Sequence, residues 1–126
     1  MEIKPMLELT RIDFGNLSSK IMKVKCENNE EMGAIKLEAL TDLLEIDQML
    51  SDKIKNGATN VDRLKDKINT LNDATTQNIN HLLKLNETLS NSNFVKKNKK
   101  SLHRARKASQ SIDNRVQKAL RKLQKQ

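Results

Sequence analysis

The chain has 126 residues, of which 32% are charged and only 2% aromatic, with three glycines and one proline. This length is enough for one small domain but not for two ordinary ones. Because strands favour aromatic and β-branched side chains, and sheets need turns rich in glycine and proline, the composition argues against a β or α/β fold. It predicts an all-α protein in which long amphipathic helices form a helical bundle or a coiled coil.

Charge is distributed unevenly along the chain. Residues 1–93 hold 12 Lys/Arg and 15 Asp/Glu, a net charge of −3, whereas residues 94–126 hold 12 Lys/Arg and one acid, Asp113, a net charge of +11. A basic end on a nearly neutral body suggests an acidic partner. Membrane headgroups, nucleic acid and an acidic protein helix all meet this description.

The N-terminal segment, residues 1–29, is predicted to contain one short amphipathic helix that starts near Asp13. Asn28 or Asn29 would cap a following helix, because an Asx side chain can accept a hydrogen bond from the first turn. The apolar residues of the short helix share one face: Leu17, Ile21 and Val24.

Residues 30–93 carry the longest heptad pattern. Their apolar positions alternate in steps of four and three, like positions a and d of a coiled coil. We predict that this seam binds the helices of other proteins or of a second copy of the chain, and that its polar members set the register. The seam comprises Leu50, Ile54, Val61, Leu64, Ile68, Leu71, Thr75, Asn78, Leu82, Leu85 and Leu89.

Two clusters of weak helix formers leave two architectures open. The first is a break at residues 56–60, where Thr59 and Asp62 could begin a new helix as a capping box. The second lies at residues 90–93, where the heptad register slips by three. Without breaks the chain is one long rod. With both breaks, which we favour, helices near 30–55, 60–90 and 94–125 fold into a bundle.

Residues 94–126 predict a basic amphipathic helix. One stripe is apolar, with Leu102, Ile112 and Val116 among its members, and the opposite stripe carries charges of nearly one sign. We predict that this cationic stripe contacts an anionic membrane surface, nucleic acid or an acidic helix. It comprises Lys97, Lys100, Arg104, Lys107, Arg115, Lys118, Lys122 and Lys125.

The sequence offers no motif for catalysis or for cofactor or metal binding. His81 and His103 have no Cys or His at a metal-ligand spacing, and the neighbours of Cys26 include no base. The glycines are isolated, which excludes a phosphate-binding loop. We therefore expect a non-enzymatic protein without cofactors. The lone cysteine, the short apolar runs and the lack of a signal-peptide pattern predict a cytoplasmic chain, at most peripheral on membranes.

Residues 40–107 resemble a SNARE motif, and the similarity rests on two stretches, residues 53–71 (KIKNGATNVDRLKDKINTL) and residues 82–102 (LLKLNETLSNSNFVKKNKKSL). The first resembles glutamine-type SNAREs of the synaptosomal-associated class in its spacing of glycine and leucine. The chain is also similar in size and texture to the small helical subunits of lysosome-biogenesis adaptor complexes. Both resemblances imply a subunit that assembles with other helices in membrane trafficking or tethering.

Overall fold

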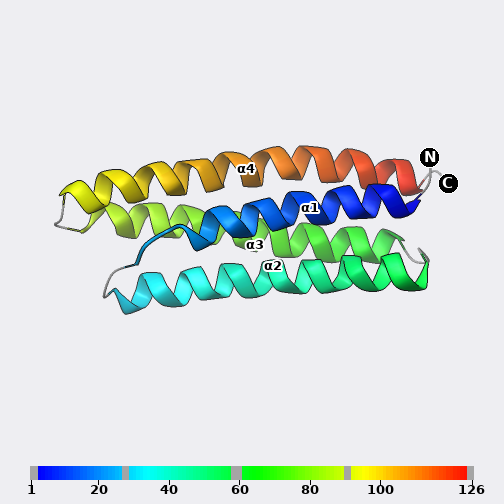
Figure 1. The fold of residues 1–126 in the computed structure, drawn as a ribbon, viewed down its shortest axis with the longest axis horizontal. Helices are drawn as coiled ribbons and strands as arrows, with labels where there is room; N and C mark the ends of the chain where they lie inside the picture. The colour runs from blue at the N-terminus through cyan, green and yellow to red at the C-terminus, as the bar shows by residue number, and fades with distance from the viewer. Residues whose placement is uncertain (1–2, 27–28, 58–60, 90–91, 125–126) are drawn as a thin grey trace.

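The computed structural model describes residues 3–26, 29–57, 61–89 and 92–124, without the side chains of residues 3, 61, 92, 120 and 122–124. It contains four helices: α1 (Ile3–Met22), α2 (Glu30–Asn56), α3 (Val61–Glu87) and α4 (Ser92–Gln124). Consecutive helices run antiparallel, and α1 packs against α4 to close the ring (Figure 1). The predicted all-α class is confirmed, in the form of an up-down-up-down bundle.

Helix α1 is longer than the sequence predicted. It begins at Ile3 rather than near Asp13 and runs for 20 residues. Pro5 does not prevent this early start, because the first amide groups of a helix have no partner within the helix and a proline there sacrifices no hydrogen bond. Residues 1–29 therefore contribute a full helix to the bundle.

Helix α2 has clear stop and start signals. The side chain of Asn29 accepts a hydrogen bond from the Met32 amide at 3.0 Å, which confirms the predicted cap. At the other end Gly57 has φ 86° and ψ 156°, a conformation that is essentially restricted to glycine. Its amide donates to Lys53 O at 3.0 Å and closes the last turn. Thr59, the predicted start of the next capping box, lies outside the described residues.

The helices beyond each break are separate elements, so the bundle that we favoured is confirmed over a continuous rod. Helix α3 ends at Glu87 and α4 begins at Ser92, two residues before the predicted start of the basic helix. The heptad slip at residues 90–93 therefore marks a change of helix. It does not mark a local overwinding of one helix.

The core is a single long column with a smaller cluster at one end. Phe14 is its largest side chain and is 1% exposed, and leucines and isoleucines from all four helices belong to the same cluster. The smaller cluster lies where the α1–α2 connection crosses the ends of α3 and α4. It comprises Val24, Met32, Ile35, Leu82 and Leu102.

Removing one large side chain from this column should destabilise the bundle strongly. Ile46 is fully buried, and we expect Ile46→Ala to lower the free energy of unfolding by about 2–5 kcal/mol. Urea denaturation followed by circular dichroism measures the change. The exposed Gln48→Ala, on the same helix, is the control and should shift stability by less than about 0.5 kcal/mol. Equal effects of the two variants would contradict this core.

Candidate functional site

The predicted seam lies inside the bundle and is divided between α2 and α3. Five of its members are buried: Leu50, Leu64, Ile68, Thr75 and Leu82. Five more are partly buried: Ile54, Leu71, Asn78, Leu85 and Leu89. The side chain of Val61 lies outside the described residues. The chain's own helices thus cover the surface that we predicted would bind partner helices.

The buried stripe of α3 departs from the predicted register after Ile68. Its next buried positions are Asn72, Thr75, Ile79, Leu82 and Asn86, so asparagines occupy places where the heptad pattern selected Leu71 and Leu85. A straight α-helix drifts by about 20° per heptad relative to a strict seven-residue repeat, which brings the following residue inward. Hydrophobicity concealed the shift at Asn72 and Asn86, where a leucine precedes the polar residue that turns inward, whereas the apolar Ile79 beside the predicted Asn78 was a sign of it.

Two of the buried asparagines join three parts of the chain near the smaller core cluster. The Asn98 side-chain amide donates to Asn86 Oδ1 at 3.0 Å, and Asn86 Nδ2 donates to Val95 O at 3.1 Å. Asn98 Oδ1 accepts a hydrogen bond from the Lys25 backbone amide at 2.8 Å. This network fixes the segment after α1 against α4, because every donor and acceptor in it would cost free energy if left buried and unpaired.

The apolar register of α4 is as predicted, and its cationic stripe faces outward. Leu102, Ala105, Ile112 and Val116 are buried. Arg115 approaches Asp13 of α1, with 3.4 Å between Nη2 and Oδ1. The other described members of the stripe are exposed: Lys97, Lys100, Arg104, Lys107 and Lys118. The Lys122 side chain and Lys125 lie outside the described residues.

Charge is separated across the diagonal of the bundle. Helix α4 holds 11 Lys/Arg and one acid, a net charge of +10, and α2 holds three Lys and seven Asp/Glu, a net charge of −4. Helices α1 (three basic, two acidic) and α3 (four of each) lie between them with net charges of +1 and 0. Helix α4 therefore lies away from the acidic α2, and the charges of these two helices do little to neutralise each other.

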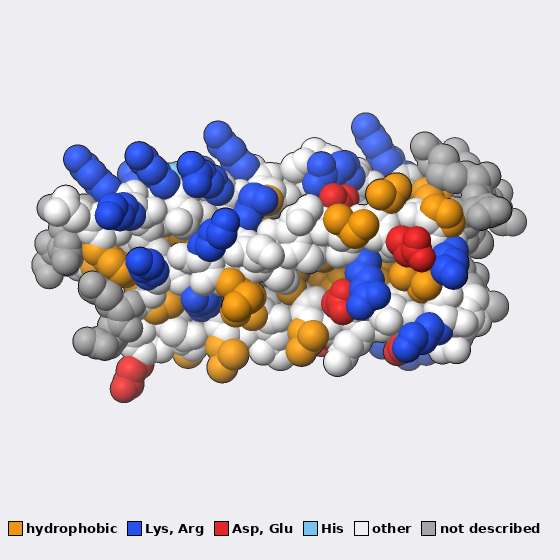
Figure 2. Space-filling model, in the orientation of Figure 1, with side chains coloured by type: hydrophobic (Ala, Val, Ile, Leu, Met, Phe, Trp, Pro, Cys, Tyr) orange, Lys and Arg blue, Asp and Glu red, His pale blue; other side chains and the backbone are white. Residues whose placement is uncertain are grey.

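Sequence reasoning missed the exposed apolar residues of α1 and α2. Leu9 and Ile12 are 63% and 58% exposed, and Met22, Leu37 and Leu44 are 65%, 65% and 57% exposed. Met22 and Leu44 line a shallow groove of about 300 Å³ between α1 and α2. Figure 2 shows this face, with Lys and Arg along the α4 edge and hydrophobic side chains over α1 and α2.

Acidic side chains largely avoid the α1–α2 groove. Asp47 lines it, but Arg11 pairs with this carboxylate at 2.6 Å between Nε and Oδ1. The pairing raises the pKa of Arg11 above its usual value. On the opposite side of α2, Glu45 lines a cavity shared with α3. Partial burial raises the pKa of Asp42, and the negative charges of the neighbouring Glu38 and Glu45 raise it further.

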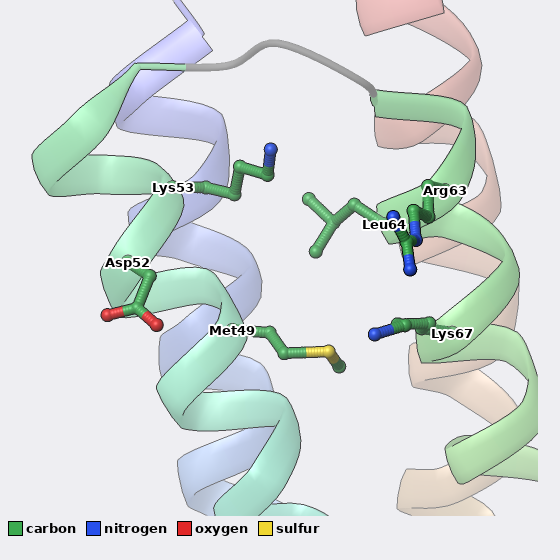
Figure 3. Close-up of a pocket in the computed structure, with 6 residues that line it drawn as sticks. All are labelled: Met49, Asp52, Lys53, Arg63, Leu64 and Lys67. Carbon is green, nitrogen blue, oxygen red and sulfur yellow. The ribbon is translucent and has the colours of Figure 1, made fainter.

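A separate cavity of about 380 Å³ lies between α2 and α3 (Figure 3). Met49 and Lys53 point into it from α2, and Leu64 and Lys67 point into it from α3. Its remaining lining residues are Asp52 and Arg63, so the lining contains no hydroxyl, thiol or imidazole group. The pairing of nucleophile and base that covalent catalysis needs is not found among these residues.

Cys26 lies beside the Lys25 segment and is partly buried. Burial raises the pKa of its thiol, and the positive charge of Lys36 lowers it by a smaller amount. A raised pKa reduces the fraction of reactive thiolate at neutral pH. Among the described residues, no group of three or more His, Cys, Asp and Glu side chains could hold a metal ion, and no helix is long and apolar enough to cross a membrane.

Removing the Asn98 side chain should loosen the segment after α1. In Asn98→Ala the Lys25 amide and Asn86 Oδ1 lose their partner, and we expect a loss of about 1–3 kcal/mol in stability. Hydrogen exchange of the Lys25 amide should accelerate more than exchange in the centre of α2. The exposed Asn114→Ala on α4 is the control and should leave both rates unchanged. An unchanged Lys25 rate in Asn98→Ala would contradict the role of the network.

Comparison of the chain with protein-family models, curated proteins and solved structures gave no match. The resemblances to SNARE motifs and to adaptor-complex subunits therefore stay predictions. In the bundle, residues 40–107 span parts of α2, α3 and α4.

Proposed function

We propose that the protein is a non-enzymatic helical interaction module that docks on anionic membrane surfaces and serves a trafficking or tethering assembly. The observation that carries the proposal is one face on which the cations of α4 lie beside exposed apolar side chains of α1, with those of α2 on the other side of α1 (Figure 2). Peripheral membrane binding combines these two elements, since basic groups attract anionic headgroups and apolar groups enter the boundary with the acyl chains.

The electrostatic part of the proposal rests on α4. Each basic residue near an anionic membrane contributes about 1 kcal/mol. Helix α4 spans about 50 Å and exposes cations along much of its length, including Lys100, Arg104 and Lys107. Several of these groups can therefore meet the headgroup region together.

The apolar part of the proposal favours a membrane over nucleic acid. Nucleic acid would need only the cations, because the bond is made to phosphates. The exposed apolar cluster consists of Met22, Leu37 and Leu44, where α1 ends beside α2. Lys36 at the start of α2 donates to Met22 O at 2.9 Å, and Met22 and Leu44 line the same α1–α2 groove. Leu37 is exposed and lies seven residues before Leu44, two turns away on the same face of α2. Exposed large apolar groups beside a cationic surface suit a lipid interface.

Vesicle co-sedimentation tests the electrostatic part. The full chain should bind vesicles of phosphatidylcholine with phosphatidylserine and should not bind phosphatidylcholine alone. The triple variant Lys100→Ala, Arg104→Ala, Lys107→Ala should lose about 3 kcal/mol of binding free energy, more than a hundredfold in partition. The matched variant Arg63→Ala, Lys65→Ala, Lys67→Ala on α3 removes the same charge and should lose far less.

The apolar part has a test of its own. Leu37→Ser with Leu44→Ser should weaken vesicle binding while the retention of the chain on a heparin column stays unchanged, because heparin reads charge alone. Binding to duplex or single-stranded nucleic acid without vesicle binding would replace the membrane proposal with the nucleic-acid alternative. If the chain binds neither nucleic acid nor vesicles, both the membrane proposal and the nucleic-acid alternative are wrong.

A second candidate function is pairing of the seam with partner helices after the bundle opens, and one observation favours it. Asn72 Oδ1 and Asn78 Nδ2 are buried without a hydrogen-bond partner among the described residues, and each such group costs about 1–3 kcal/mol. The middle of α3 therefore contains buried polar atoms whose hydrogen-bonding capacity is not met within the described residues. A bundle that opens at α3 would free the seam residues Leu64, Ile68 and Leu82 to pair with partner helices or with a second copy.

Hydrogen exchange tests this opening. If the bundle opens at α3, amides near Asn72 and Asn78 should exchange through an opening that costs less free energy than global unfolding. Asn72→Leu with Asn78→Leu should raise that cost by removing the unpaired groups. Exchange of these amides only by global unfolding would exclude the opening.

A further inference from the structure

A cavity of about 390 Å³ lies at the junction of α1 and α4, on the cationic side of the bundle. Lys23 and Lys25 line it from the segment that follows α1, and Lys97 and Ser101 line it from α4. Asn93, Phe94 and Asn98 complete the wall. The volume falls in the range of about 300–1,000 Å³ that is usual for small-ligand sites. No carboxylate belongs to this described lining.

The packing of the bundle positions the two lysines from the segment after α1. Val24 stands between them and is 1% exposed, held in the smaller core cluster. Its amide donates to Ile21 O at 3.0 Å, and the Lys25 amide donates to Asn98 Oδ1 at 2.8 Å. With Val24 turned inward, Lys23 and Lys25 are both exposed and line the same cavity.

The chemistry of the lining suits a doubly charged anion. Three lysines from two separate elements belong to the lining, together with Ser101, whose hydroxyl donates to Lys97 O at 3.4 Å. Residues Asn93 and Phe94 belong to the first turn of α4, where the helix dipole adds partial positive charge. Phosphomonoesters carry close to two negative charges at neutral pH and several acceptor oxygens, which match such a set of donors.

We propose that this cavity binds the phosphomonoester of a phosphorylated lipid headgroup; the inference rests on the membrane docking proposed above and assigns it a specific ligand. The place of the cavity argues for a lipid source. Met22, which immediately precedes Lys23, belongs to the exposed apolar cluster and lines the α1–α2 groove. A headgroup held at Lys23 and Lys25 therefore lies next to a side chain that can enter the acyl boundary.

Two other cation-lined hollows lack this combination. Lys96, Lys99 and Lys100 line a surface hollow whose residues all come from α4, so it lacks a second wall. The cavity between α2 and α3 includes Asp52, whose carboxylate would repel an anion. Of these three cavities, the one at the α1–α4 junction is lined by cations from two elements and by no acid among the described residues.

The experiment uses the full chain and two kinds of probe. Vesicles of phosphatidylcholine carry either a phosphatidylinositol phosphate or phosphatidylserine, at equal total surface charge. Soluble inositol trisphosphate and inorganic phosphate are titrated separately and followed by amide chemical shifts. We expect tighter binding to the phosphatidylinositol phosphate vesicles, and shifts from inositol trisphosphate at residues 23–25 and 93–101.

A matched pair of variants assigns the preference to the cavity. Lys23→Ala with Lys25→Ala should weaken binding to phosphatidylinositol phosphate vesicles by about tenfold per ammonium group, the effect of losing one charge-assisted hydrogen bond. Binding to phosphatidylserine vesicles should weaken less, by only the general contribution of about 1 kcal/mol that each lysine makes at an anionic surface. Lys118→Ala with Arg121→Ala removes the same charge from the far end of α4 and should weaken both vesicle types equally. Unchanged circular dichroism establishes that the variants fold.

The outcomes separate this inference from the proposed function. Absence of binding to phosphatidylserine vesicles counts against membrane docking itself. Equal binding to the two vesicle types, or equal effects of the two variants, overturns the headgroup site and leaves general docking intact. Shifts from inorganic phosphate or inositol trisphosphate without a vesicle preference identify a soluble phosphate ligand and overturn the lipid assignment.

Discussion

Burial of one narrow apolar stripe on each of four helices is the constraint on which the structure depends. With Phe14 as the only aromatic side chain in the core, the bundle is filled by leucine, isoleucine and methionine, and each helix must face inward along its whole length. Contact between α1 and α4 closes the ring, so the longest and most basic helix keeps one face in the core and turns the other to solvent. The cationic surface is thus a consequence of how the core is closed.

The fold was largely accessible from the sequence because its signals are local. Asn29 and Gly57 delimit α2 through cap chemistry that depends on one or two residues. The apolar stripe of α4, from Leu102 to Val116, could be identified because the opposite face of the helix is strongly charged. Helix α1 was underestimated because the residues before Asp13 mix apolar and charged side chains around Pro5, although a proline in the first turn leaves a helix intact.

The candidate site was accessible only in part. Lys97, Lys100 and their neighbours were identified from charge, which a sequence displays directly. Lys23 and Lys25 were not identified. They line the cavity because Val24 between them is buried and because Asn98, more than seventy residues away in the sequence, accepts a hydrogen bond from the Lys25 amide. The apolar cluster of Met22, Leu37 and Leu44 combines two helices, and no single-helix pattern contains it.

Separation of charge between α2 and α4 has a kinetic consequence. A molecule with net charges of −4 and +10 on diagonally opposite helices has a large dipole across its short axis. In the field of a negatively charged surface it rotates before contact so that α4 leads, and Leu37 and Leu44 of α2 reach that surface only after the bundle turns about its long axis. Encounter rates would then depend steeply on ionic strength, whereas the time spent on the surface would depend on the short-range contacts made after arrival.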